Sequence, residues 1–159
     1  DKLPGFTLLV GGVGRDLAEV QAAEKSGAPI RTLGRLEGRT KALALKAADV
    51  MLIPERMGMV AVDSMVSGLP IVTTHHDSHS PEVEYLIPNR NVIFAGHSTD
   101  EYADRVVELL RDTKSLTYMQ LRSAADAEMF GINEMVNRFA GGLGAWIHHR
   151  TIQQAPPSY

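Results

Sequence analysis

The chain has 159 residues and a formal net charge of −3 at pH 7, which argues against a general binder of nucleic acids or membrane surfaces. Hydrophobic residues make up 44% and charged residues 22%, as is usual for a globular domain with its own core. Cysteine is absent, so disulfides and thiol chemistry are excluded. Cysteine usage therefore does not indicate the cellular compartment of the protein. No apolar run reaches transmembrane length and no signal-peptide pattern occurs, so we expect a cytoplasmic protein.

Short apolar strands alternate with amphipathic helices along the first two thirds of the chain. This alternation predicts an α/β fold with a doubly wound, parallel, Rossmann-like sheet. Ser80 and Asp100 are the expected N-cap residues of the last two helices of this part. The expected strands span 6–10, 30–33, 50–53, 70–73 and 92–94, and the expected helices span 15–26, 39–47 and 59–67, with two more starting at 81 and 100.

Beyond residue 112 the pattern changes to two helical segments, expected over 116–129 and 134–149. Three glycines in the second segment weaken it by up to ~1 kcal/mol each relative to Ala, so docking of its apolar side must hold it in place. That side carries Val136, Phe139, Leu143, Trp146 and Ile147. We expect one domain over residues 1–150 and a flexible tail over residues 151–159.

The most informative stretch runs from Ile53 to Thr74: a strand end, a tight loop, a helix and a second strand. The preceding apolar run predicts a strand buried on both faces. The loop leads into a helix N-terminus at the carboxyl edge of the sheet, where α/β proteins bind anionic ligands. The apolar residues expected to face inward from this helix are Met59, Val62, Met65, Val66 and Leu69.

Two carboxylates bracket this site. Glu55 lies in the loop and Asp63 about one turn into the helix. Because carboxylates repel phosphates, they are better suited to accept hydrogen bonds from neutral hydroxyls. A nucleoside diphosphate sugar has an anionic centre with hydroxyls on either side, and it fits this pattern.

Two other motifs have competing interpretations. Gly11, Gly12 and Gly14 suggest a nicotinamide-dinucleotide fingerprint, but Leu17 holds the position of its third glycine. The turn can instead approach a phosphate or sugar through its backbone N–H groups. A cluster of three histidines and an aspartate over residues 75–79 suggests zinc, but the absence of cysteine and of a second ligand cluster argues against a zinc site.

Glu55 and Asp63 are separated by seven residues and followed by Gly68-Leu69-Pro70. This resembles the donor-site signature of retaining GT-B glycosyltransferases, the superfamily of group 1 glycosyltransferases and glycogen synthases. The resemblance extends over about residues 6–112, through the segments 8–14, 30–36, 47–50 and 79–85. The sequence departs from the pattern at Asp63, where the family usually has Glu, and at Arg56 and Met57, where small and aromatic residues are usual.

The resemblance implies the donor-binding, C-terminal half of such an enzyme, which transfers a sugar to an acceptor hydroxyl with retention and without a metal or bound cofactor. Glu55 would be the catalytic-site residue that binds sugar hydroxyls, and Asp63 would hold the ribose. The other implied donor-binding residues are Gly12 at the glycine turn, Leu33, Gly34 and Arg35 near the base, Gly58, Met59 and Val60 through their backbone N–H groups, and His79 near a phosphate.

The implied partners are a nucleotide-sugar donor and an N-terminal acceptor domain of the same protein, with no nucleic acid; membrane association is left open. The chain starts at what resembles the second strand of the family's domain, so we expect it to bind donor but to be inactive alone. A non-catalytic nucleotide-binding module and a sugar-nucleotide epimerase domain are the alternatives.

Overall fold

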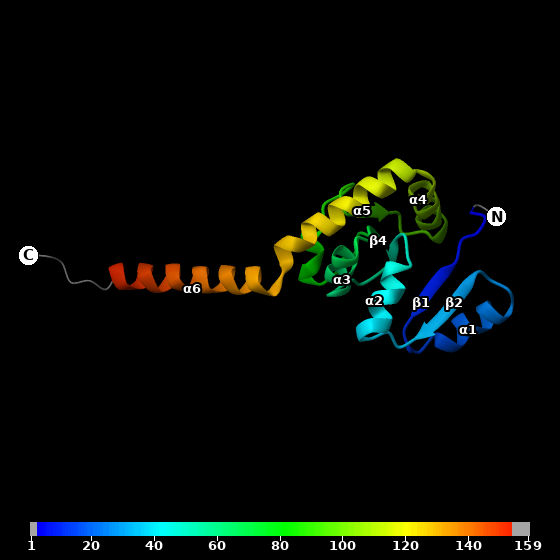
Figure 1. Ribbon diagram of the computed structural model, residues 1–159, viewed down its shortest axis with the longest axis horizontal. Coiled ribbons are helices and arrows are strands. Elements are labelled where there is room, and N and C mark those ends of the chain that lie inside the picture. The colour runs from blue at the N-terminus through cyan, green and yellow to red at the C-terminus, as the bar shows by residue number, and fades with distance from the viewer. Residues whose placement is uncertain (1–2, 154–159) are drawn as a thin grey trace, which may run out of the picture.

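The computed structural model describes residues 3–153 and confirms an α/β fold with parallel strands (Figure 1). The strands are β1 (Leu8–Gly11), β2 (Ile30–Gly34), β3 (Met51–Ile53), β4 (Ile71–Thr74) and β5 (Val92–Ala95). The helices are α1 (Leu17–Lys25), α2 (Gly38–Lys46), α3 (Val60–Ser67), α4 (Thr99–Arg111), α5 (Thr113–Ala127) and α6 (Ile132–Gln153), with 3-10 turns η1 (Pro81–Tyr85) and η2 (Glu128–Phe130).

The strands form two sheets where the sequence pattern predicts one. β1 pairs with β2, and β3, β4 and β5 form a second sheet in the order β3-β4-β5. Every pairing is parallel. Figure 1 shows β1, β2 and α1 grouped on one side of the body, apart from β4 and α5.

The hydrophobic core lies on both faces of the three-stranded sheet. Each of the four residues of β4 is buried. On one face Met65 and Ala61 of α3 pack with Ile71 and Val92, and on the other Val106 and Leu109 of α4 pack with Val72. The second sheet contributes no residue to either cluster.

β1 and β3 are less buried than their apolar sequences predict. All three residues of β3 and the first three of β1 are only partly buried. Each of these strands pairs with one neighbour, and its other edge faces a groove between the two sheets. The expectation of a β3 strand buried on both faces is therefore wrong for this structure.

One capping prediction is wrong and a second is confirmed only in its position. α4 begins one residue after Ser98, whose hydroxyl accepts the Glu101 N–H at 3.2 Å, so Ser98 and not Asp100 is the N-cap. Ser80 precedes η1 as expected, but its side chain makes no capping hydrogen bond. Both caps lie in Ser/Asp-rich loops, where several polar residues suit the same position.

The buried face of α3 is shifted from the predicted one. Met65 and Leu69 are buried, whereas Met59 is 64% and Val66 66% exposed. Ala61 and Ser64 take the inward positions instead, and the Ser64 hydroxyl donates to the Leu69 carbonyl at 2.7 Å. Small residues on this face let α3 lie close to the sheet.

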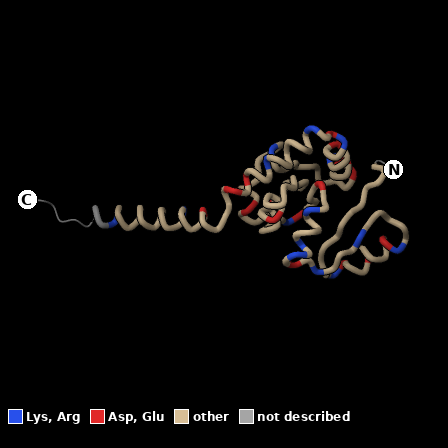
Figure 2. The backbone as a smooth tube through the Cα atoms, in the orientation of Figure 1, with Lys and Arg blue, Asp and Glu red and all other residues tan. Residues whose placement is uncertain are grey.

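The helix α6 extends away from the body (Figure 1). Its predicted apolar side is exposed, from 47% at Leu143 to 75% at Phe139, so the expected docking is not seen within residues 3–153. Figure 2 shows that most of α6 is free of charged residues. α6 continues to Gln153, and the rest of the predicted tail lies outside the described residues. Over the described part of the chain, no helix has the length and apolar character needed to cross a membrane.

Candidate functional site

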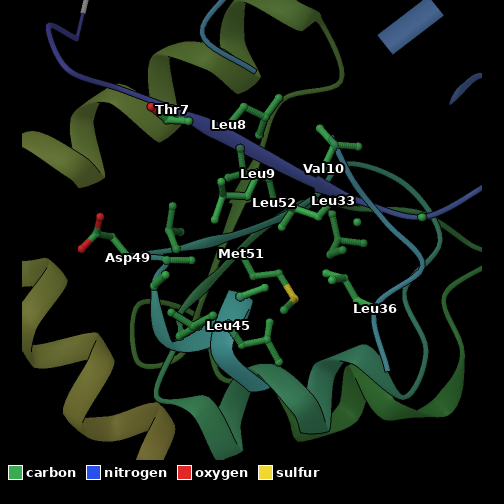
Figure 3. A pocket seen from close by; sticks show the side chains of 18 of the residues that line it. Thr7, Leu8, Leu9, Val10, Leu33, Leu36, Leu45, Asp49, Met51 and Leu52 are labelled. Carbon is green, nitrogen blue, oxygen red and sulfur yellow. The ribbon is translucent and has the colours of Figure 1, made fainter. Parts of the chain in front are cut away.

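A groove of about 1350 Å³ separates the two sheets, and several predicted donor-binding residues line it (Figure 3). Gly12 and Leu33 come from the ends of β1 and β2, and Val60 comes from the start of α3. Arg35 and Lys41 line the same space. The groove therefore reaches the carboxyl ends of the strands, where parallel sheets place their ligands.

The loop before α3 is held by a buried methionine. Met57 is fully buried in the core cluster of α3. Its carbonyl accepts the Ser80 N–H at 2.9 Å, and the Thr74 hydroxyl donates to the Pro54 carbonyl at 2.6 Å. Glu55, between these two anchored positions, is exposed. The loop thus presents Glu55 to solvent on a fixed backbone.

His79 completes the anchoring of this loop. Its Nδ1 accepts the Met57 backbone N–H at 3.2 Å, so its Nε2 carries the hydrogen and donates to the Thr74 carbonyl, 2.8 Å away. Both ring nitrogens are engaged with backbone groups. The predicted contact between His79 and a phosphate would require one of these hydrogen bonds to break.

The start of α3 has backbone donors free for a ligand. Ala61 and Val62 donate to the carbonyls of Gly58 and Met59, at 2.9 and 3.0 Å. Within residues 3–153, no hydrogen bond from the N–H of Gly58, Met59 or Val60 is found. These orphan N–H groups and the helix dipole together favour an anion at this position.

Asp63 forms an ion pair that the sequence analysis missed. Lys41 Nζ of α2 lies 2.9 Å from both carboxylate oxygens of Asp63. The side chains are 41% and 36% exposed, so the pair is open to solvent. The Lys41 ammonium brings a positive charge to the groove beside the α3 N-terminus. Because Lys41 and Asp63 are 22 residues apart, no local sequence pattern indicates the pair, and it becomes visible only in the packing of α2 on α3.

The glycine turn joins the ends of β1 and β2. A Cβ on Gly11 would lie 2.5 Å from Leu36 Cδ1, so a larger residue there would require the Leu36 side chain to shift. Gly12 has a φ of +148°, and its N–H donates to the Gly34 carbonyl at 2.7 Å. Leu33 is 38% exposed, and the predicted base-binding segment therefore offers a partly open apolar surface.

The histidine-rich loop gathers no metal-ligand set. His75 stacks on Phe94 with ring centroids 4.2 Å apart, and His76 Nδ1 lies 2.7 Å from the Ser78 hydroxyl. In the part of the chain that the structure describes, no three His, Asp or Glu side chains converge in a way that could hold a metal ion.

The comparisons with known proteins agree with this arrangement. Residues 1–112 match the family described as glycosyl transferases group 1. The chain is 36% identical over 92 residues to a phosphatidyl-myo-inositol mannosyltransferase of Mycobacterium leprae, a match that covers 52% of this chain and 23% of the relative. It is 32% identical over 88 residues to a D-inositol 3-phosphate glycosyltransferase of Nocardia farcinica, covering 54% of this chain and 19% of the relative.

A solved structure shares the fold over most of the chain. The pneumococcal O-GlcNAc transferase GtfA, in complex with UDP and GlcNAc, superposes with a TM-score of 0.70 at 21% identity, covering 92% of this chain and 31% of that one. This chain thus corresponds to less than a third of each of these three proteins. The family match covers more than half of the chain, and the chain therefore belongs to the group 1 glycosyltransferases.

Proposed function

We propose that the protein containing this chain is a glycosyltransferase whose donor, a nucleoside diphosphate sugar, binds at the carboxyl edge of the strands. The observation that carries the proposal is the set of free N–H groups on Gly58, Met59 and Val60 at the α3 N-terminus, beside the Lys41–Asp63 pair. A diphosphate supplies the anion that such donors favour.

Side chains on either side of these N–H groups suit the nucleoside and the sugar, which are the two ends of the donor. Asp63 is a carboxylate that can accept hydrogen bonds from ribose hydroxyls, and it is exposed enough to reach them. Leu33, which is 38% exposed, and Arg35 line the groove on either side of Gly34 in the sequence, and this segment suits a nucleobase. We assign Glu55, which is exposed on its anchored loop, to the hydroxyls of the sugar.

Retention and independence of a metal or cofactor belong to the proposal through the resemblance to retaining GT-B enzymes. In the transition state, fixed donors at the leaving diphosphate stabilise the charge that develops on it. Lys41 would add a positive charge on the same side. The acceptor would be bound by a separate N-terminal domain of the full protein, so this chain alone would bind the donor without transferring the sugar.

Isothermal titration of the chain with UDP, uridine and inorganic phosphate tests donor binding. We expect UDP to bind at least about tenfold more tightly than uridine, because only UDP reaches the α3 N-terminus. Each tenfold step corresponds to about 1.4 kcal/mol, which is close to the lower end of the range for one charged hydrogen bond. Equal affinity for UDP and uridine would contradict a diphosphate site here.

A further inference from the structure

The carboxyl edge of the three-stranded sheet carries an aromatic pair beside the Glu55 loop. β4 ends at Thr74, and His75 follows it directly. The His75 ring stacks on the ring of Phe94 in β5, with the two centroids 4.2 Å apart and the two planes 7° from parallel. Neither residue of this pair belongs to the proposed donor site.

The alignment of β3 with β4 places His75 next to Glu55. The two strands are paired in parallel, and just beyond this pairing the Thr74 hydroxyl donates to the Pro54 carbonyl at 2.6 Å. Glu55 follows Pro54 in the chain, and His75 follows Thr74. These two residues therefore leave neighbouring strands at the same level of the carboxyl edge.

The position of His75 is fixed by its surroundings. The carbonyl of Thr74, the preceding residue, accepts a hydrogen bond from His79 Nε2 at 2.8 Å. Phe94, on which the His75 ring lies, is partly buried and packs against the core cluster that contains Met57. The His75 ring therefore rests on a support that belongs to the core. A ring that is already ordered loses little conformational freedom when a ligand binds.

The outer face and both nitrogens of the His75 ring are open to a ligand. His75 is exposed, and its stack on Phe94 uses one face of the ring. Within residues 3–153, neither ring nitrogen of His75 has a hydrogen-bond partner. The other two histidines of the loop differ in this respect. His79 engages both of its ring nitrogens, and His76 Nδ1 lies 2.7 Å from the Ser78 hydroxyl.

A pyranose ring has the shape and polarity that this arrangement suits. One face of a pyranose carries C–H groups, which can pack on an aromatic ring as other apolar groups do. The hydroxyls around its rim need hydrogen-bond partners. A neutral imidazole offers one donor and one acceptor, and the Glu55 carboxylate is a further acceptor. Small-molecule sites combine an aromatic surface with a few polar groups in this way.

We propose that the outer face of His75, supported by Phe94, is a platform on which a pyranose ring of a substrate packs while its hydroxyls bind Glu55. The inference rests on the proposed function, because sugar transfer is what brings a pyranose to this edge of the sheet. It adds a sugar-binding residue outside the segment that carries Glu55 and Asp63. The pyranose is the sugar of the donor or a sugar of the acceptor, and two measurements distinguish these sources.

Isothermal titration of the 159-residue chain with UDP and with UDP-glucose tests the donor sugar. A platform for this sugar predicts that His75→Ala weakens UDP-glucose binding by about two- to tenfold. The affinity for UDP, which lacks the donor sugar, should not change. His75→Phe keeps an aromatic face and should restore the affinity. His76→Ala, at the neighbouring exposed position, is the matched control and should leave both affinities unchanged.

Saturation-transfer NMR without nucleotide tests an acceptor sugar. A platform predicts transfer from the aromatic protons of the chain to the C–H protons of methyl α-mannopyranoside, which is lost in His75→Ala and kept in His75→Phe. Mannitol has similar hydroxyls but no ring, so it should receive little transfer. Transfer that depends on His75, together with an unchanged affinity for UDP-glucose, assigns the platform to the acceptor. A weakened affinity for UDP-glucose in His75→Ala assigns it to the donor.

Failure of the platform and failure of the proposed function give different results. Absence of UDP binding by the wild-type chain contradicts the proposed function, whereas the platform is judged by the effect of His75→Ala on UDP-glucose and on the glycoside. If His75→Ala matches the wild type in both measurements, the platform is overturned. A lower Tm of His75→Ala as the only change would show that the stack serves to cover Phe94.

Discussion

Lys41 Nζ of α2 lies 2.9 Å from each carboxylate oxygen of Asp63 in the first turn of α3. The pair joins the two helices beside the groove, at the position where the ribose of the donor is proposed to lie. Since both side chains are more than a third exposed, the pair contributes at most about 1 kcal/mol to stability. Its main effect is to hold the Asp63 carboxylate in a fixed orientation.

Replacing Asp63 tests its role in binding the ribose. Asp63→Ala should weaken UDP binding by about 1.5–3 kcal/mol, the value of a charged hydrogen bond, while the protein stays folded. A 2′,3′-dideoxy analogue of UDP should bind the wild type and the variant equally. Isothermal titration measures both ligands. Unchanged affinity for UDP in Asp63→Ala would remove Asp63 from the ribose site.

His79 is expected to act by positioning the loop that carries Glu55. His79→Ala removes the acceptor of the Met57 N–H and the donor to the Thr74 carbonyl, so the free energy of unfolding should fall by about 1–3 kcal/mol. The Met57 amide should also lose protection against hydrogen exchange. His76→Ala, in the exposed part of the same loop, is the matched control and should change neither quantity. Equal effects of the two variants would contradict the anchoring role.

The order of the strands and helices was predictable from the sequence because it depends on local patterns. The alternation of apolar runs with helical periodicity predicted each strand and helix to within a few residues. The spacing of Glu55 and Asp63 likewise identified the N-terminus of α3 as the candidate site. The roles of the two carboxylates are proposals.

Other features depend on contacts between distant segments and left no local signal. The sequence shows Lys41 only as one cation among several, and its pairing with Asp63 follows from the packing of α2 on α3. Met57 was treated as a departure from a family pattern, but it is fully buried and anchors the loop. The open edges of β1 and β3 could not be read from their apolar sequences, because burial of a strand depends on neighbours that the strand itself does not specify.

A buried ion pair should make stability depend on pH. Asp126 of α5 is 2% exposed and pairs with Arg90 at 2.5 Å, and Asn91 donates to it at 3.1 Å. The hydrogen bonds from Arg90 lower the pKa of Asp126 from its ordinary value of 3.8, against the opposing effect of burial. The carboxylate contribution is therefore fully present above about pH 3.8 and is lost as the pH falls through the lowered pKa.

Asp126→Asn tests this contribution. At pH 7 it should reduce the free energy of unfolding by about 1.5–3 kcal/mol, because it weakens hydrogen bonds to a charged group. The difference from wild type should shrink as the pH falls below the ordinary aspartate range. Asp100→Asn, at an exposed position of α4, is the control and should have little effect. Denaturant titrations from pH 2 to 7 measure this, and a pH-independent difference between Asp126→Asn and wild type would contradict the assignment.

The exposure of α6 leads to a prediction about truncation. A chain that ends after Phe130 keeps the stacking of Phe130 on Tyr85, whose ring centroids are 4.2 Å apart, and removes only the exposed helix. Its Tm should differ from that of the full 159-residue chain by no more than about 3 °C, since a change of 1 kcal/mol shifts the Tm by 2–4 °C at this size. Phe130→Ala in the truncated chain should lower the Tm further. A large loss on truncation alone would show that α6 packs against the body in solution.

The measurement that tests the account most directly is the turnover of Glu55→Gln in the full protein, beside its affinity for UDP. Glu55 is proposed to bind the hydroxyls of the sugar, whose placement matters most as the glycosidic bond breaks. Gln keeps the size of the side chain and removes the charge. Arg56→Gln, at the neighbouring exposed position, is the matched control.

We expect Glu55→Gln to lower kcat by about 100-fold or more, equivalent to about 2.7 kcal/mol, while UDP affinity stays within about twofold of wild type and Arg56→Gln retains most of its activity. Loss of UDP affinity with unchanged kcat would place Glu55 on the nucleotide instead of the sugar. Unchanged turnover in Glu55→Gln would contradict the proposed transferase site.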